Sequence, residues 1–354
     1  MKRLMLATTA LFALSGVSVA AADISISGNI RFHYDAWSDD KVDTETESGN
    51  NNNSFADGDM QLWIKGTTVT DSGLTYSAEV RFRDDDKGAS NIGANTNVDR
   101  RYLTIGDDWG KITLGRQWAP SYSMSLGQDW RGTISYGGGD GVARDSGLST
   151  DSYLSASTSG RADKIIYQTP DIGGFKAGIS FADAGKSSKA NSTEYAVNYS
   201  LTAFGDGKVR FGYAAAQQSA KDNADASTET DKAEYGVEVS TGRMTVSVIQ
   251  FTKEDTPNNT TAAKVSKQKG QEAELAYKVS DSLTLNVVYL KNEVEESATH
   301  KDDDYKSTAI GAKYTIAPGL YTSLGYKNFD YTDASDKTMD NSGNTIRVRV
   351  HASF

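Results

Sequence analysis

The 354-residue sequence contains no cysteine, only four prolines and only three histidines. Without cysteine the chain has no disulfide, no zinc–thiolate site and no thiol nucleophile. Hydrophobic residues make up 37% of the chain, below the roughly 45–50% of ordinary globular proteins, so material for an aliphatic core is scarce. The net charge of −10 argues against nucleic acid as the main partner, because a phosphate backbone requires a basic face. Hydropathy alone would place this chain among soluble polar proteins.

The longest apolar stretch lies at the amino terminus. A basic start, MKR, precedes the apolar run 4–19, and three alanines at 20–22 supply small residues for cleavage. This order predicts a secretory signal peptide over 1–22 and a mature chain, 23–354, that forms a single domain. An uncleaved anchor is the other interpretation, but the run is short and interrupted by Thr, Ser and Gly. Removing the peptide leaves 35 basic against 47 acidic residues, a net charge of −12.

Apolar and polar residues alternate with period two throughout the mature chain. In 74–83, for example, Leu, Tyr, Ala, Val and Phe alternate with Thr, Ser, Glu and two arginines, and 346–354 repeats the pattern. Such alternation is typical of half-exposed strands and not of helices. Sixteen strands are expected, at 24–36, 58–70, 74–84, 97–107, 111–118, 162–169, 174–183, 190–201, 207–217, 231–240, 243–253, 270–279, 283–293, 304–315, 319–330 and 343–354.

The connections between these strands alternate between tight turns and long polar loops. Residues 71–73 and 108–110 form two of the turns, whereas 37–57 and 119–161 form two of the loops. All four prolines lie in connections, where a missing N–H breaks no ladder bond. Most strands are close to the roughly 9–11 residues that cross a bilayer when tilted. The pattern predicts an all-β fold, a transmembrane antiparallel 16-stranded barrel, closed because an open sheet leaves backbone groups unsatisfied in lipid.

A soluble β-sandwich or a β-rich adhesin would show the same alternation. A sandwich needs apolar faces that fill a core, whereas these faces carry single aliphatic residues and many of the 18 tyrosines. Aromatic residues also gather near the expected strand ends, where a barrel meets the two membrane interfaces. They are Tyr34, Trp37, Trp63, Trp109, Trp118, Tyr167, Phe175, Tyr289, Phe329 and Phe354. The opposite faces carry charges of both signs, which suits a water-filled lumen.

Five motifs follow one another along the mature chain. They are DISISGNIRFHYD, GDMQLWIKG, GKITLGRQW, RADKIIYQTPDIGGF and a terminal IRVRVHASF that ends on Phe354. Their order resembles that of Gram-negative general porins, particularly the alphaproteobacterial type. The resemblance implies an outer-membrane homotrimer of sixteen-stranded barrels, each pore narrowed by an inward-folded long third loop, here the constriction loop 119–161. The acidic PEFGG stretch of enterobacterial relatives is missing, and 134–141 reads ISYGGGDG instead.

Side chains that line a diffusion pore act by charge, size and field, and not by catalysis. The parity of the first strands directs Arg31, Arg81, Arg83 and Glu79 into the lumen. Arg100 is adjacent to another arginine, so only one of the two can point inward from a regular strand, and Arg100 is assigned to the pore. These arginines are expected to form a positive wall.

Arg116 is a case in which parity and resemblance disagree. It shares the parity of Ile112 and Leu114, which would direct it to lipid. In the porins that the chain resembles, the arginine of the LGRQ motif faces the pore, which here would require a bulge near Gly115. The resemblance therefore adds Arg116 to the positive wall.

The loop 119–161 supplies the acidic counterpart of that wall. Asp129, Asp140 and Asp145 are the candidate carboxylates, and together with the arginines they would create a field across a narrow aqueous slit. Such a field passes small polar solutes and disfavours apolar ones. The excess of acidic residues predicts a weak preference for cations.

A cofactor is not expected, and no catalytic signature such as GxSxG or HExxH occurs. Asp84, Asp85 and Asp86 form an acidic cluster where a strand meets a long loop. Two interpretations stay open, a solvated acidic rim and a weak Ca²⁺ site built from hard oxygen ligands.

The sequence therefore predicts a non-enzymatic outer-membrane channel for passive diffusion of small hydrophilic solutes and ions. Expected partners are two further copies of the chain, outer-membrane lipid and lipopolysaccharide, and the barrel-assembly machinery, which reads a terminal aromatic in the proteins that the chain resembles. Two alternatives remain. A porin specific for phosphate or an oligosaccharide would need an unusually basic or aromatic-lined lumen, and a surface barrel or adhesin would not conduct at all.

Overall fold

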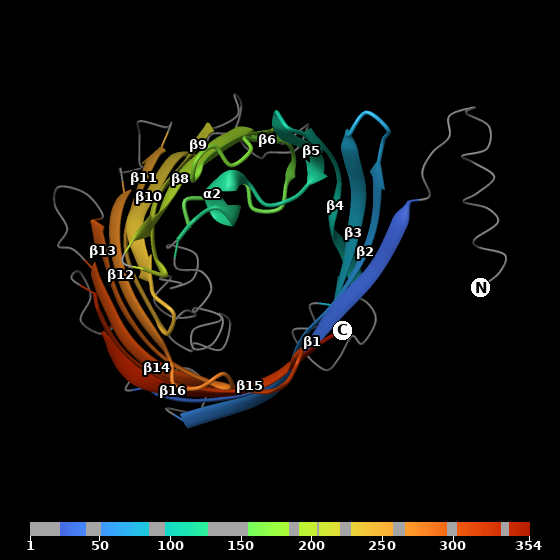
Figure 1. Cartoon of the computed structure of the whole chain (residues 1–354). Helices are drawn as coiled ribbons and strands as arrows, with labels where there is room; N and C mark the ends of the chain where they lie inside the picture. Colours follow the sequence, from blue (N-terminus) through green and yellow to red (C-terminus); the bar gives the residue numbers. More distant parts are fainter. Residues whose placement is uncertain are drawn as a thin grey trace.

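In the computed structural model, sixteen strands close into one antiparallel β-barrel (Figure 1). The structure describes residues 22–39, 51–84, 96–126, 155–183, 191–203, 205–219, 228–257, 266–295, 303–333 and 340–354. The strands are β1 (Asp23–Asp39), β2 (Asn51–Val69), β3 (Thr75–Asp84), β4 (Thr96–Asp107), β5 (Gly110–Arg116), β6 (Asp163–Gln168), β7 (Phe175–Ala182), β8 (Asn191–Ala203), β9 (Gly207–Ser219), β10 (Thr228–Ser240), β11 (Met244–Pro257), β12 (Ser266–Lys278), β13 (Leu283–Glu295), β14 (Asp303–Ala317), β15 (Leu320–Thr332) and β16 (Asn341–Ser353). Each strand pairs with its neighbours in sequence, and β1 pairs with β16. The all-β, 16-stranded barrel expected from the sequence is confirmed.

Several strands run further than the alternation of apolar residues indicated, and the largest extensions lie on the side of the long connections. β2 begins at Asn51 and not at 58, and β12 begins at Ser266 and not at 270. Beyond the apolar band of a membrane barrel both faces of a strand meet water, so polar residues continue the ladder without the apolar signal. Period two therefore identifies the strands but not where each one ends.

The outer face of the barrel carries the apolar side chains. Leu103, Leu114 and Ile165 lie side by side across β4, β5 and β6, and all three are exposed. At the short-turn end of the same wall, Trp109 and Tyr167 stack with ring centroids 6.4 Å apart. This arrangement fits an apolar belt with aromatic residues at its edge. In the described part of the chain, no helix has the length and apolar composition needed to cross a membrane.

The seam between β1 and β16 joins the first strand to the last. The backbone N–H of Gly28 donates to the carbonyl of Phe354 at 2.9 Å, and the N–H of Phe354 donates back at 3.0 Å. A Cβ on Gly28 would lie 2.6 Å from the Phe354 ring, so this approach requires glycine. On the inner face, Arg347 donates to both carboxylate oxygens of Asp35 at 2.6 and 2.7 Å, and both side chains are buried.

The short turns are built from close backbone approaches. Gly110, between β4 and β5, has a φ of +109°, and a Cβ there would lie 2.3 Å from the carbonyl oxygen of Gln168. In the turn between β6 and β7, Asp171 accepts a hydrogen bond from the backbone N–H of Gly174 at 2.8 Å. That bond and the ammonium of Lys176 hold the pKa of the Asp171 carboxyl below its ordinary value.

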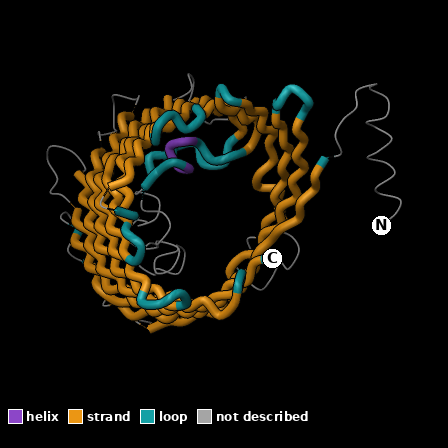
Figure 2. The backbone as a smooth tube through the Cα atoms, viewed as in Figure 1, coloured by secondary structure: helices purple, strands orange, loops and turns teal. Residues whose placement is uncertain are grey.

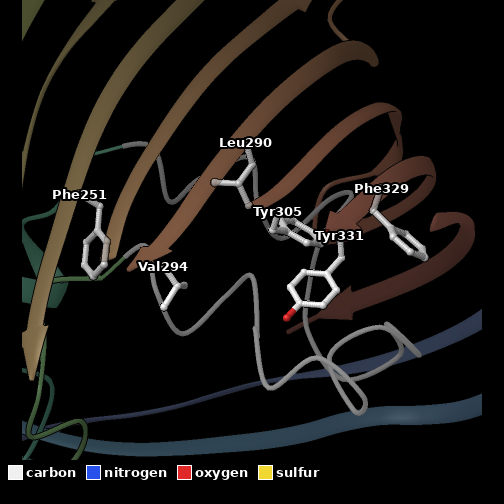
Figure 3. Packing of buried hydrophobic residues seen from close by; sticks show 6 residues of the cluster. All are labelled: Phe251, Leu290, Val294, Tyr305, Phe329 and Tyr331. Atoms are coloured by element: carbon white, nitrogen blue, oxygen red, sulfur yellow. The ribbon is translucent and has the colours of Figure 1, made fainter. Parts of the chain in front are cut away.

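An apolar cluster lies at the long-loop ends of β11, β13, β14 and β15 (Figure 3). Its six buried members are Phe251, Leu290, Val294, Tyr305, Phe329 and Tyr331. Leu290 is buried while its chain neighbour Tyr289 is exposed on the outer face, so the cluster belongs to the inner face. Phe329, expected at a membrane interface, is part of this inner cluster. The inner face is therefore not uniformly polar.

The short helix α2 (Pro120–Ser123) lies inside the ring of strands (Figures 1 and 2). The sequence did not predict this helix, although a proline at the first helical position is favourable there. Pro120 packs on the inner face at Gly178, where a Cβ would lie 2.8 Å from the proline Cβ. The first described end of the segment 119–161 therefore lies on the inner wall, and the middle of the segment, 127–154, lies outside the described residues.

Candidate functional site

The pairing register identifies the residues that face the lumen. Trp63, Arg81 and Arg100 lie side by side across β2, β3 and β4. The alternate residues Ile64 and Leu103 are exposed on the outer face. The same alternation continues around the ring, so polar and charged side chains concentrate on the inner face.

Arg81 is the centre of a basic cluster on β3 and β4. Its Nε donates to Asp99 Oδ1 at 2.6 Å, its Nη1 donates to Gln61 Oε1 at 3.1 Å, and Arg161 also donates to Asp99. The register between β3 and β4 shifts next to Arg81, so Asp99 is an extra residue that forms a bulge beside Arg100. One carboxylate thus connects an arginine of the wall with an arginine from the end of the segment 119–161.

Two tryptophans support these arginines from inside the barrel. The guanidinium carbon of Arg81 lies 5.6 Å from the ring centroid of Trp63, and that of Arg161 lies 5.3 Å from the centroid of Trp118. Trp118 also stacks on Tyr122 of α2 with centroids 3.8 Å apart. Cation–π contacts of this kind hold arginine side chains against the wall. Trp63 and Trp118 were expected at membrane interfaces, but these contacts place them in the lumen.

A second basic group lies on β1, β14, β15 and β16. Arg31 is opposite His351 in the register of β1 and β16. Two positions further along the same pair of strands, His33 is opposite Arg349. The His351 ring stacks on Tyr321 with centroids 4.6 Å apart, and Lys313 Nζ lies 4.2 Å from the Tyr321 centroid. This group extends the basic wall across the seam of the barrel.

Carboxylates gather on the inner face of β8, β10 and β12. Glu194, Glu234, Glu272 and Glu274 are all buried there, and the partly exposed Lys232 lies on the same face of β10. Figure 1 shows these strands across the ring from β1 to β4. The two sides of the lumen therefore carry mainly opposite charge, which creates an electric field across the space between them.

The first end of the segment 119–161 is tied to the acidic side of the wall. The backbone N–H of Leu126 donates to Glu234 Oε1 at 3.1 Å, and Asn198 Nδ2 donates to the carbonyl of Met124 at 2.9 Å. Gly212 leaves room for this approach, since a Cβ there would lie 2.8 Å from Leu126 Cγ. The chain that carries α2 is thus fixed to the inner wall by polar contacts and close packing.

The structure places most of the wall residues predicted from sequence on the inner face. These are Arg31, Glu79, Arg81, Arg83 and Arg100. The predicted carboxylates of the loop and most of the acidic cluster lie outside the described residues, namely Asp129, Asp140, Asp145, Asp85 and Asp86, as does the side chain of Asp84. In the described ranges, no three or more His, Asp or Glu side chains are grouped as metal ligands would be.

The placement of Arg116 requires a correction. Arg116 lies opposite Arg101 on β4 and Asp163 on β6, and no register shift interrupts the pairing of β5 with either neighbour. Arg101 and Asp163 are exposed, as is Leu114, which lies two residues before Arg116 on the outer face. Gly115 has a φ of +124° but forms no bulge, so Arg116 keeps its outward parity. The position implied by resemblance is not adopted.

Sequence reasoning missed several charged residues of the inner wall. Glu194 alternates with exposed tyrosines on β8, and Arg349 stands on the polar face of the last strand, so parity alone could have assigned both. Asp99 has no such signal. It reaches Arg81 because of a bulge, and a single irregular residue does not alter the alternation enough to be recognised.

A family model described as Gram-negative porin matches residues 7–334 of the chain. None of the curated proteins compared with the chain matches it. Among solved structures, the trimer form of OmpT from Vibrio cholerae is 18% identical, with 95% of this chain and 100% of that chain covered and a TM-score of 0.70. An anion-selective porin from Comamonas acidovorans is 15% identical (94% and 100% covered, TM-score 0.71), and OmpF of Salmonella typhi in complex with daunomycin is 14% identical (94% and 98% covered, TM-score 0.67).

At these identities the structural likeness shows the fold, a barrel of porin type. The family match extends over most of the chain and therefore shows more than the fold. The chain belongs to the Gram-negative porin family and is an outer-membrane channel, not an enzyme.

Proposed function

We propose that this porin forms a water-filled channel for the passive diffusion of small hydrophilic solutes and ions. The observation that carries the proposal is the division of the inner wall into a basic side on β1–β4 and β14–β16 and a carboxylate-rich side on β8–β12. A transverse field in an aqueous lumen orients water and polar solutes and disfavours apolar ones. The described ends of the segment 119–161 lie against the inner wall of the same lumen.

The constriction residues follow from this division. We assign pore-lining roles to Arg31, Glu79, Arg81, Arg83 and Arg100 on the wall, and to Asp129, Asp140 and Asp145 on the segment 119–161. Arg116 is left out because it lies on the outer face. The five ordered sequence motifs support a place among porins of the alphaproteobacterial type.

A weak preference for cations is supported by two observations. The mature chain carries a net charge of −12 once the proposed signal peptide 1–22 is removed. Two carboxylates offset part of the positive charge of the wall, since Asp99 contacts both Arg81 and Arg161, and Asp35 binds Arg347. The remaining wall arginines keep this preference weak.

The assembly is proposed to be a homotrimer in outer-membrane lipid and lipopolysaccharide, after insertion by the barrel-assembly machinery. The trimer form in which the similar OmpT was solved supports this stoichiometry. Electrophoresis in SDS without heating tests it, because a trimer of this type should migrate at three times the monomer mass and dissociate on boiling. Migration as a monomer after mild extraction, confirmed by cross-linking, would exclude the trimer.

Swelling of liposomes that contain the purified protein tests passive diffusion. Small sugars should enter at rates that fall with molecular size, and reversal potentials in a salt gradient should show a small cation preference. Arg81→Ala should increase that preference and Asp140→Ala should reduce it. If neither substitution changed the reversal potential, the assigned constriction would be incorrect.

The basic group on β1 and β14–β16 favours one second candidate, a porin specific for phosphate. Lys313, Arg31 and Arg349 concentrate positive charge on a single part of the inner wall. A specific porin would bind its solute, so phosphate added at low concentration should block the chloride current. A current that depends only on bulk conductivity favours the general channel.

A further inference from the structure

Glu194 is the point at which the two described ends of the segment 119–161 meet. Its side chain is fully buried on the inner face of β8. Ser121 of α2 donates its hydroxyl to Glu194 Oε2. From the other end of the segment, Ser159 donates both its hydroxyl and its backbone N–H to Oε1, the latter at 2.8 Å. One carboxylate therefore joins residues that are 38 positions apart in the chain.

The surroundings of Glu194 keep it in this double contact. Ser192 donates its hydroxyl to Oε1 at 3.1 Å, and the Thr158 hydroxyl lies 2.6 Å from that of Ser192. Lys164 donates to the Ser159 hydroxyl at 2.6 Å and to the carbonyl of Gly160 at 2.7 Å. A buried carboxylate with this many donors is satisfied only while both chain ends remain against the wall.

We propose that Glu194 is a positioning residue for conduction, which keeps α2 and the stretch 155–162 against the wall of β8 and out of the open lumen. This inference rests on the proposed channel function. It adds that the free cross-section depends on one buried carboxylate, because the chain segments that it holds lie inside the ring (Figures 1 and 2). Hydrogen bonds to a charged group are strong, so each one lost should lower the ratio of docked to undocked ends by about tenfold or more.

Single-channel recording of Glu194→Ala tests the proposal. The released ends should enter the lumen and leave it again, which appears as increased open-channel noise and frequent partial closures. The matched control is Glu238→Gln, since Glu238 lies on the inner face of β10 and, among the described residues, contacts Arg210 at 3.1 Å and neither end of the segment. The control should record as quietly as the wild type.

A covalent link between the two ends of the segment tests whether Glu194 acts by holding them, because a merely structural role of Glu194 would not be replaced by such a link. The chain has no cysteine, so Ser121→Cys and Ser159→Cys introduce the only two thiols. Joined by a short thiol-reactive cross-linker with a reducible bond, they should restore quiet conduction to Glu194→Ala, and reduction should bring the noise back. The urea midpoint of the barrel should stay unchanged in both states.

The outcomes distinguish a failure of the proposed channel function from a failure of the positioning role of Glu194. A wild-type protein without conductance would overturn the channel function itself. A conducting wild type with Glu194→Ala equally quiet would overturn only the positioning role. If Glu194→Ala does not fold, Ser159→Ala in the otherwise unchanged chain takes its place, and noise equal to that of the wild type would again contradict the inference.

Discussion

Replacing Asp99 by Asn should shift the ion selectivity of the channel toward anions. Asp99 lies between Arg81 and Arg161, and its side chain is 14% exposed at the lumen wall. The substitution removes one negative charge and leaves both arginines in place. A permeating anion is therefore stabilised and a permeating cation destabilised at the same point of the pathway.

The size of the shift follows from Coulomb's law. A unit charge about 5 Å from a permeating ion in water contributes roughly 0.8 kcal/mol, so the anion-to-cation difference changes by about 1.6 kcal/mol. Screening in about 0.1 M salt, where the Debye length is about 10 Å, reduces this to about 1 kcal/mol. That energy corresponds to roughly a fivefold change in the permeability ratio.

Reversal potentials in a salt gradient measure this ratio directly. Asp108→Asn is the matched control, because it removes the same charge from an exposed turn between β4 and β5. The Asp99→Asn shift should also shrink as the salt concentration rises, since screening weakens it. A shift no larger than that of the control, or a shift toward cations, would refute the role assigned to Asp99.

Two further predictions concern the seam of the barrel. Asp35→Asn removes the carboxylate that binds the buried Arg347, which should lower the free energy of unfolding by about 3 kcal/mol. Urea unfolding in micelles measures this loss. As a control, Glu238→Gln in a more exposed ion pair should lower it by less than about 1 kcal/mol. Deleting Phe354 removes its two backbone hydrogen bonds to Gly28 and should lower the unfolding midpoint, whereas Phe354→Ala keeps both bonds. Equal midpoints for the deletion and the alanine variant would show that these bonds do not hold the seam.

The fold could be predicted from the sequence because a barrel of this type repeats one simple rule. Alternation identified all sixteen strands, and the alternation of short and long connections gave their antiparallel order. The strand ends could not be predicted, as at Asn51, because outside the apolar band both faces are polar. The helix α2 was missed because four residues are too few for a periodic signal.

The lumen was predictable only where the strands are regular. Arg31, Arg81 and Arg83 follow parity and face inward as expected. Asp99 depends on a bulge, and Arg116 was misplaced because a family resemblance was given more weight than its parity. Parity within a strand is a local property of the backbone, whereas bulges depend on how neighbouring strands pair, and one sequence does not reveal that pairing residue by residue.

Whether the lumen conducts is decided by recording single channels of the purified protein in a planar bilayer. We expect discrete current steps whose conductance rises in proportion to the conductivity of the bulk electrolyte, as in a water-filled pore. A protein that is β-rich and correctly folded, yet inserts without producing any current step, would contradict the proposed diffusion channel.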